Sequence, residues 1–212
     1  MSLSSQSSEV IYSSTDFSGF KEAVLNAGRE LAFSKGMTLR PKKNEILIVM
    51  SGQMSVSASS KHDLIIGHTF PFFPIGLLEL YYEMPLYYKA ELDIVVTQLS
   101  EKEFNQVVLG DSKNSALLIR ILTFMTTEMI HVYFERNNDS GYATIRQMLM
   151  RYMYKSENDK IGNEGVASFI LKRTRLSRSY VFQILSGLKA GGYITVKNGK
   201  LTSINRDIPK RF

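Results

Sequence analysis

Residues 173–189 constrain the fold of this chain more than any other segment, because they combine a helix start, an apolar stripe and a cluster of cations. Ser177 is a suitable N-cap, since its hydroxyl can accept a hydrogen bond from a free backbone N–H of the first helical turn. The apolar residues that follow have the i, i+3, i+4, i+7 spacing of a buried helix face: Val181, Ile184, Leu185 and Leu188. The residues on the other side are Ser179, Gln183 and Ser186. The pattern predicts a short helix with a polar face and a basic amino-terminal end, which fits the major groove of DNA.

Positive charge is concentrated in the last third of the chain. The formal net charge of the whole chain is +6. Residues 141–212 hold 14 Lys and Arg against 4 Asp and Glu, a net charge of +10, whereas residues 1–140 have a net charge of −4. This asymmetry is typical of a domain that binds a polyanion, because cations that neutralise phosphates release condensed counterions. A solvated basic surface or a contact with an anionic membrane would give the same count.

Composition excludes several classes of protein. The chain has no cysteine, so structural disulfides, thiolate metal sites and thiol redox sensing are excluded. No uninterrupted apolar run approaches the ~20 residues of a membrane span, so no membrane partner is expected. Residues 1–14 are rich in serine and lack the features of a signal peptide, which favours a frayed tail and a cytoplasmic location.

The region before residue 105 predicts a small β domain flanked by helices. Residues 16–33 have near-helical apolar spacing, and Ser100 with Glu103 forms a capping-box pattern for a short helix. Between them lie short strand-like runs at 45–50, 54–58, 63–66, 70–73, 86–90 and 94–99. Strands at this spacing suggest an antiparallel barrel or sandwich.

A long helix is predicted from about Ser115 to Phe134. One apolar stripe on it has the 4-3-4-3 spacing of heptad a and d positions: Leu118, Leu122, Met125, Met129 and Val132. A second apolar line runs beside it: Leu117, Ile121 and Phe124. Two stripes allow one to pack against the chain's own domain and the other against a second copy, so we expect a homodimer. The alternative is a fully buried helix in a monomer.

The carboxyl-terminal segment has the element order of a winged helix-turn-helix. A polar, turn-rich stretch at 137–141 suggests a hinge, and helices are expected at 142–154 and 163–172 before the helix at Ser177. Gly191 and Gly192 end that helix, and Asn198-Gly199 joins two short strands as a two-residue hairpin turn. Lys197 and Lys200 at the hairpin tip would lie beside DNA phosphates.

Over nearly its whole length the chain resembles the CRP/FNR superfamily of bacterial transcription regulators. Residues 48–56 look like the family's strand–glycine–strand hairpin, and 176–188 with 193–194 look like its recognition helix and the entry to its wing. Residues 173–187 and 199–206 are similar to the enterobacterial branch called inhibitor of hydrogen peroxide resistance (IprA, YaiV-like). That branch implies control of oxidative-stress or virulence-linked genes.

The patterns and the resemblance together imply an α+β fold. We expect an N-terminal helix and a degenerate antiparallel β-roll like a cyclic-nucleotide-binding domain at residues 1–112, a long dimerisation helix at 113–136, and a C-terminal winged helix-turn-helix at 137–212. The expected partners are double-stranded DNA and a second copy of the chain, with RNA polymerase as a candidate and any small-molecule effector unknown.

Departures from the family argue against a bound cyclic nucleotide or cofactor. Residues 74–90 lack the family's Gly-Glu and Arg-Ser/Thr pairs, and no arginine occurs between Arg40 and Arg120. A buried phosphodiester without a guanidinium would cost several kcal/mol. Lys89 could replace the guanidinium as a point charge, but lysine lacks the bidentate fork of arginine. The histidines are too scattered for a metal or haem set. The aromatic residues of this region can fill the roll or bind an apolar effector: Phe70, Phe72, Phe73, Tyr81, Tyr82, Tyr87 and Tyr88.

The resemblance also places base-reading residues on the helix at Ser177. The family's reading positions fall on Arg178, Ser179 and Gln183; Arg178 can bind guanine, and Gln183 can bind adenine. The family usually has other residue types at the last two positions, so its commonest operator should bind poorly. The full set expected at DNA is Arg173, Arg175, Ser177, Arg178, Ser179, Tyr180, Gln183, Lys197 and Lys200.

Three functions are compatible with these features. The first is a sequence-specific DNA-binding transcription regulator. The second is a non-specific nucleic-acid binder, and the third is a protein-interaction module with a degenerate helix-turn-helix. An enzyme is not expected, because the sequence shows no nucleophile–base set, no phosphate-binding glycine loop and no metal cluster.

Overall fold

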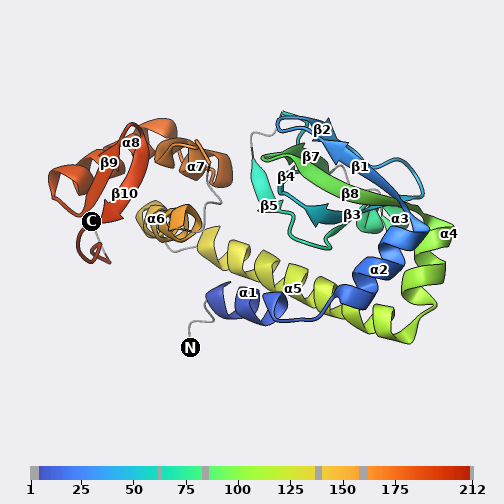
Figure 1. Ribbon diagram of the computed structural model, residues 1–212. Helices are drawn as coiled ribbons and strands as arrows, with labels where there is room; N and C mark the ends of the chain where they lie inside the picture. The colour runs from blue at the N-terminus through green and yellow to red at the C-terminus, as the bar shows by residue number, and fades with distance from the viewer. Residues whose placement is uncertain (1–4, 62–63, 83–85, 137–139, 158–161, 211–212) are drawn as a thin grey trace. The chain divides into compact units, whose positions relative to one another are not determined.

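The computed structural model describes residues 5–61, 64–82, 86–136, 140–157 and 162–210 (Figure 1). The chain forms two compact units, Met1–His131 and Val132–Phe212. The first contains antiparallel sheets with helices, and the second contains helices with a hairpin, so the predicted α+β class is confirmed.

Two four-stranded antiparallel sheets form the β-roll of the first unit. One has the order β1 (Arg29–Phe33), β8 (Ile94–Ser100), β3 (Glu45–Ser51) and β6 (Pro74–Ile75). The other has the order β2 (Thr38–Leu39), β7 (Tyr87–Ala90), β4 (Met54–Ser57) and β5 (Ile65–His68).

Strand β3 has a continuous apolar sequence because both of its faces are buried. Leu47 and Val49 belong to the core cluster shared with the second sheet, whereas Ile46 and Ile48 belong to the cluster under the helices. Successive side chains of a strand point to opposite faces, so a strand covered on both sides has no polar alternation. After β3, Gly52 turns the chain into β4 with a φ of 84°.

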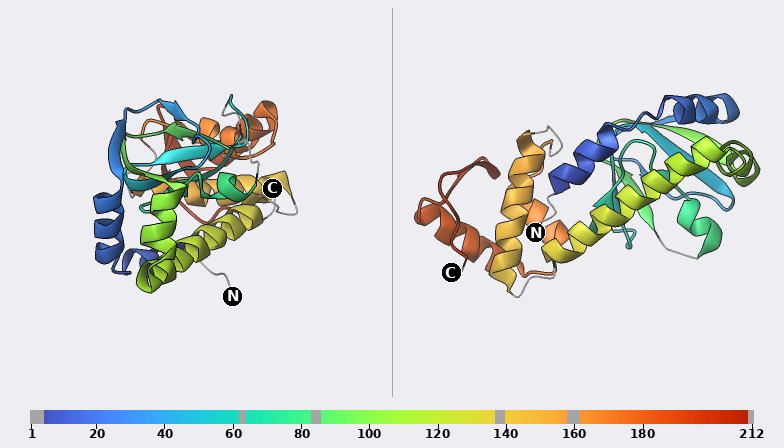
Figure 2. Two further views of the ribbon diagram at one scale, coloured as in Figure 1. Left: turned by 90° about the vertical axis from the view of Figure 1, so that its right-hand side faces the viewer. Right: turned by 90° about the horizontal axis from the view of Figure 1, so that it is seen from below.

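Helices cover the outer face of the β1-β8-β3-β6 sheet (Figures 1 and 2). The helices of this unit are α1 (Ser5–Ser13), α2 (Ser18–Ala27), α3 (Leu77–Tyr81), α4 (Glu101–Phe104), the π-helical turn η1 (Asn105–Leu109) and most of α5 (Ser112–Arg136), which continues past His131. The predicted capping box is confirmed at α4, where Ser100 Oγ accepts from Glu103 N and the Glu103 carboxylate accepts from Ser100 N.

Three predictions for this region were wrong. The helix expected over 16–33 ends at Ala27, because Gly28 is extended and residues 29–33 pair with β8 as β1. The strand expected at 70–73 is a turn in which Phe72 has a φ of 66°. The expected frayed tail contains α1, which is fixed by Tyr12: its ring stacks on Phe124 at 4.3 Å between ring centres, and its hydroxyl donates to Pro71 O.

Most of the aromatic side chains between residues 70 and 88 pack inside the first unit. Phe70 packs against Phe73 and Phe124, and Phe73 packs against the buried ring of Tyr88. Tyr81 and Tyr82 differ from this, because both are largely exposed at the end of α3.

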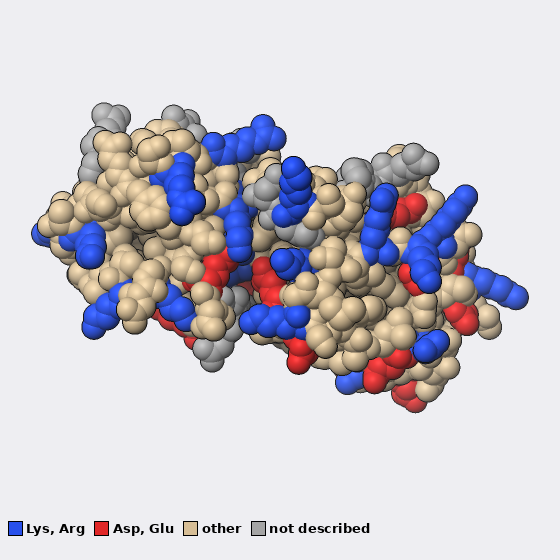
Figure 3. All heavy atoms as spheres, turned by 90° about the horizontal axis from the view of Figure 1, so that it is seen from above, with Lys and Arg blue, Asp and Glu red and all other residues tan. Residues whose placement is uncertain are grey.

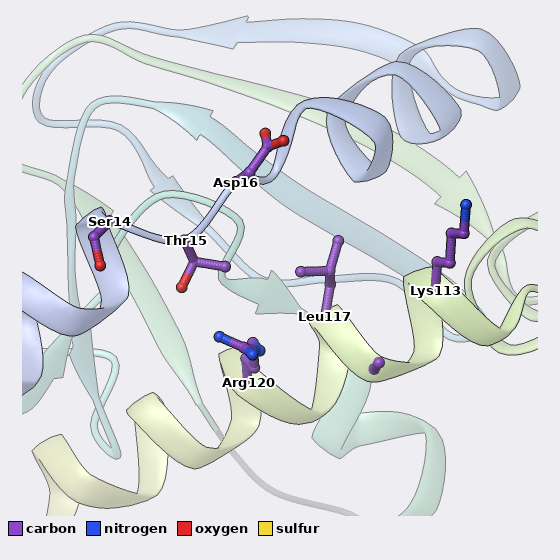
Figure 4. Close-up of a pocket in the computed structure, with 7 residues that line it drawn as sticks. Ser14, Thr15, Asp16, Lys113, Leu117 and Arg120 are labelled. Carbon is purple, nitrogen blue, oxygen red and sulfur yellow. The ribbon is translucent and has the colours of Figure 1, made fainter.

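An open pocket of about 480 Å³ lies between residues 14–16 and the first turns of α5 (Figure 4). Asp16, Lys113 and Arg120 line it, so it carries both signs of charge. The Asp16 carboxylate accepts a hydrogen bond from Ser18 N, the first residue of α2, at 2.9 Å, and this bond lowers the pKa of the carboxyl.

Helix α5 carries apolar side chains both in the core and on its exposed side. Leu118 and Ile121 lie in the core, but Ile119, Met129 and Ile130 are about half exposed or more. Residues Ser112–Phe134 are long and apolar enough to cross a membrane by length and composition. The sequence expectation of no span rested on uninterrupted apolar runs, and the Thr and Ser residues of α5 interrupt them.

The second unit contains α6 (Gly141–Glu157), α7 (Val166–Arg173), α8 (Arg178–Ala190) and the hairpin β9 (Ile194–Lys197) to β10 (Lys200–Ile204). These elements enclose one core, to which α6 contributes Ile145, Leu149 and Tyr152. The N-cap of α7 is Gly165, two residues after Asn163, the cap that the sequence predicts. Most of the predicted hinge, residues 137–139, lies outside the described residues.

Candidate nucleic-acid interface

Helix α8 has the start that its sequence predicts. Ser177 Oγ accepts a hydrogen bond from Tyr180 N at 3.3 Å, and Ser177 itself has extended backbone angles, as an N-cap requires. At the other end Gly192 has a φ of 71°, and Tyr193 N donates to Leu188 O at 2.9 Å. The helix is therefore closed at both ends by the residues that the sequence suggested.

The turn between α7 and α8 is shaped by Thr174. Its side chain is buried; Thr174 Oγ1 donates to Ile170 O at 2.9 Å and accepts from Leu176 N at 3.4 Å. This local bonding fixes the turn without help from Arg175, whose side chain is exposed. A large residue at position 175 is thus compatible with the turn.

Helix α8 divides sharply into a buried and an exposed face. Val181, Ile184, Leu185 and Leu188 are at most 8% exposed and pack in the core of the second unit. The exposed side chains are those of Arg178, Ser179, Phe182, Gln183, Ser186 and Lys189. The exposed face therefore combines cations, hydrogen-bonding groups and one aromatic ring.

Phe182 is the residue of this face that sequence reasoning missed. It is 45% exposed, and the Cζ atom of Arg178 lies 5.7 Å from the centre of its ring. Phe182 does not fit the 181-184-185-188 apolar stripe, so its helical position alone could have placed it on the exposed face.

Arg173 requires a correction, because it is not at the surface. Its side chain is buried, Arg173 Nη1 lies 2.9 Å from Glu164 Oε2, and its Cζ lies 3.9 Å from the centre of the Phe169 ring. The guanidinium instead joins α7 to the segment that precedes it. The sequence alone does not show which cation of this region is buried, because that depends on the position of Glu164 in the folded unit.

Tyr180 is also less free than expected. Its ring packs partly on the core of the second unit and lies close to Gly141, where an added Cβ would be 2.8 Å from Tyr180 Cε1. The glycine thus allows the start of α6 to approach α8. Tyr180 supports the position of α8 more than it presents a free side chain.

The hairpin has the predicted turn. Asn198 and Gly199 have φ values of 49° and 77°, as a type I′ turn requires. Gly199 O accepts from Val166 N at 2.8 Å, so the hairpin tip also holds the start of α7.

The two lysines of the tip differ in their surroundings. Lys197 is exposed, whereas Lys200 Nζ donates to Gly162 O at 3.0 Å and to Asn163 Oδ1 at 3.1 Å. Lys197 therefore presents its charge to solvent, and Lys200 ties the hairpin to the turn before α7. In the view of Figure 3, Lys and Arg side chains are spread over the visible surface, with Asp and Glu side chains among them.

The predicted dimerisation stripe lies partly against the chain's own domain. Leu118 is 6% exposed in the core, and Leu122 and Met125 pack against core clusters of the first unit. Of that stripe, Met129 is 62% exposed. The exposed apolar side chains of α5 fall mainly on a neighbouring line that includes Ile119, Ile130 and Tyr133, one residue further along.

Among the residues that the structure describes, no group of three or more His, Cys, Asp or Glu side chains is placed to hold a metal ion.

The comparisons with known proteins agree with this geometry. Residues 141–210 match the family described as winged helix-turn-helix DNA binding. The chain is 41% identical over 74 residues to the inhibitor of hydrogen peroxide resistance of Salmonella typhimurium and 40% identical over 73 residues to that of Escherichia coli K12. These matches span about a third of this chain and about a third of each relative, 35% and 34% respectively.

Solved structures extend the likeness to both units. The c-di-GMP responsive global regulator CLP of Xanthomonas campestris has a TM-score of 0.67 at 15% identity, with 89% of this chain and 99% of that chain covered. A protein of Eubacterium rectale assigned to the crp/fnr family of transcriptional regulators has a TM-score of 0.66 at 11% identity, with 92% and 93% covered. The chain thus has the fold of CRP/FNR regulators, with a winged helix-turn-helix at its carboxyl end.

Proposed function

We propose that this chain is a transcription regulator that recognises specific sequences in double-stranded DNA, a proposal supported by its CRP/FNR fold and its winged helix-turn-helix. The observation that carries the proposal is the division of α8: one face is buried in the core, and the other presents Arg178, Ser179 and Gln183 to solvent. An exposed arginine can bind the O6 and N7 atoms of guanine, and an exposed glutamine can bind adenine. Arg175 and Lys197 are exposed cations suited to phosphate contacts.

Selection of bound sequences from a random duplex pool by the full chain tests this proposal. We expect an enriched motif, and an Arg178→Ala variant that loses preference at one base pair of each half-site at a cost of about 1–3 kcal/mol. A Lys197→Ala variant should weaken binding to all duplexes alike. If random duplex competes as well as the enriched motif at physiological salt, the chain is a non-specific binder. If no duplex is bound, the helix-turn-helix does not act on DNA.

We propose further that the chain acts as a homodimer through α5. Its support is the exposed apolar line that includes Ile119, Ile130 and Tyr133, since exposed apolar patches of this kind commonly mark protein interfaces. A dimer would place two α8 helices on half-sites about one helical turn apart, so the enriched motif should have dyad symmetry.

The roll is proposed not to bind a cyclic nucleotide in the family manner. Tyr88 is 1% exposed, and its hydroxyl donates to Glu79 Oε1 at 3.4 Å inside the roll. Burial raises the pKa of Glu79, and when ionised this carboxylate would repel a phosphodiester. Thermal denaturation with and without cyclic AMP or cyclic GMP tests the point, and a concentration-dependent rise in Tm would contradict it.

Control of oxidative-stress genes is proposed from the name of the two relatives, both called inhibitor of hydrogen peroxide resistance. The test compares peroxide survival of cells that carry the wild-type gene, a deletion or an Arg178→Ala allele. We expect the deletion and the allele to survive better than wild type. Unchanged survival in both would remove the stress assignment and leave DNA recognition untouched. Action on chromosomal DNA implies a cytoplasmic location.

A further inference from the structure

An aromatic ring stands near the middle of the exposed face of α8. Phe182 lies four residues after Arg178 and four before Ser186, so these three side chains form one row along the helix. Both neighbours are exposed, and Phe182 is 45% exposed. The ring is therefore presented by the same surface as the residues proposed to read bases.

The core does not account for this ring. The four apolar residues of the buried face fill their positions at 8% exposure or less, and Phe182 lies outside their stripe. A half-exposed phenylalanine gains free energy when an apolar group covers it.

The position of Arg178 restricts which ligand groups can pack on the Phe182 ring. Its guanidinium carbon lies 5.7 Å from the ring centre, within the range of a cation–π contact. A group that Arg178 binds will therefore lie next to the group that Phe182 touches.

The chemistry of the major groove supplies a matching pair of groups. The edges of the bases there carry hydrogen-bonding atoms, and the C5 methyl of thymine is the apolar group among them. Arginine pairs with guanine, and phenylalanine is suited to the thymine methyl. We propose that Phe182 contacts the C5 methyl of a thymine adjacent to the guanine bound by Arg178. This inference rests on the proposed function of α8.

Replacement of thymine by deoxyuridine tests the contact directly, because it removes the methyl group and keeps the base pairing. A motif is first enriched from random duplex with the full chain. Fluorescence anisotropy then gives the Kd of the wild type for duplexes in which each thymine of the motif is replaced in turn. We expect one position per half-site, next to the guanine, at which the loss of the methyl raises Kd about fourfold.

Variants of Phe182 supply the second arm of the experiment. Phe182→Ala should bind the thymine duplex more weakly and should no longer distinguish it from the deoxyuridine duplex. Phe182→Leu should keep part of the discrimination, since it keeps an apolar side chain. Lys189→Ala, which removes an exposed side chain about two turns further along α8, should keep all of the discrimination.

The outcomes separate this inference from the proposed function. If no motif is enriched, sequence-specific recognition itself fails. If a motif is enriched and every deoxyuridine duplex binds the wild type as the thymine duplex does, Phe182 does not read a methyl group. The same conclusion follows if Phe182→Ala discriminates as well as the wild type. The measurement on the wild type needs no variant, so a folding defect cannot obscure it.

Discussion

Arg173 and Glu164 form a buried ion pair, with 2.9 Å between Nη1 and Oε2. Arg173 Nη1 also donates to Phe169 O at 3.2 Å, and Lys172 Nζ lies 3.1 Å from Glu164 Oε1. Glu164 belongs to the segment before α7, and Tyr152 of α6 donates its hydroxyl to Glu164 O at 2.7 Å. This pair therefore links α6 and α7 through the segment that precedes α7.

Removal of the arginine should destabilise the second unit. Arg173→Ala leaves the mostly buried Glu164 carboxylate with Lys172 beside it, so the cost should lie below the roughly 3–5 kcal/mol of a buried charge left without a partner, at about 2–3 kcal/mol. Urea denaturation monitored by circular dichroism measures the loss. The matched control is Arg175→Ala, which removes an exposed arginine two residues away and should change stability by less than about 0.5 kcal/mol. Equal stability of the two variants would contradict the structural role of Arg173.

Sequence reasoning succeeded where local chemistry decides the structure. The Ser177 cap, the Ser100–Glu103 capping box and the Asn198-Gly199 turn each depend on residues within a few positions of one another, and all three are present. It was wrong where distant partners decide. The helix predicted over residues 16–33 included residues 29–33, but these residues pair with β8 as a strand.

The candidate site follows the same rule. The exposure of Arg178, Ser179 and Gln183 is fixed by the period of one helix, so the sequence places them correctly. The burial of Arg173 and the anchoring of Lys200 depend on Glu164 and on residues 162–163, which approach only in the folded unit. Likewise, the sequence of α5 does not show which of its apolar lines packs against the roll and which is exposed.

The two lysines of the hairpin should differ in their effect on DNA affinity. Lys197→Ala removes an exposed cation, so the slope of log Kobs against log salt concentration should fall in magnitude by about 0.9. Lys200→Ala removes two hydrogen bonds within the protein, so it should lower the stability of the second unit by about 1–3 kcal/mol. Its effect on the salt slope should be smaller than that of Lys197→Ala. Titrations of one duplex over a range of salt concentrations, with thermal denaturation of both variants, decide the matter; equal slopes for the two would show that Lys200 also contacts phosphates.

The exposed line of α5 should control self-association. Ile130→Glu places a charge on a residue that is 49% exposed, and we expect it to raise the dimer Kd at least about tenfold without unfolding the chain. Sedimentation equilibrium measures the change. Leu109→Glu is the matched control, since Leu109 is 45% exposed at the end of η1, away from this line.

Leu118 gives the contrasting case on the same helix. Because it is buried in the first unit, Leu118→Ala should cost about 2–5 kcal/mol of stability. Its folded fraction should associate as the wild type does. A dimer unaffected by Ile130→Glu but weakened by Leu118→Ala in folded protein would favour the 118-122-125-129-132 stripe as the interface.

Glu79 should make the stability of the first unit depend on pH. Burial raises the pKa of this carboxyl above its usual value of 4.5, although Tyr88 and Arg40 oppose the shift. The folded state therefore retains a proton that the unfolded state has lost, and stability falls as pH rises from about 4.5 through the pKa of the folded state. Glu79→Gln is uncharged throughout, so its Tm should exceed that of the wild type at neutral pH, and the difference should shrink towards pH 4. Glu103→Gln should show the opposite sign, because hydrogen bonds from Ser100 lower the pKa of Glu103 and stabilise its ionised form at neutral pH. Parallel Tm profiles for Glu79→Gln and the wild type between about pH 4 and pH 7 would contradict the raised pKa of Glu79 in the folded state.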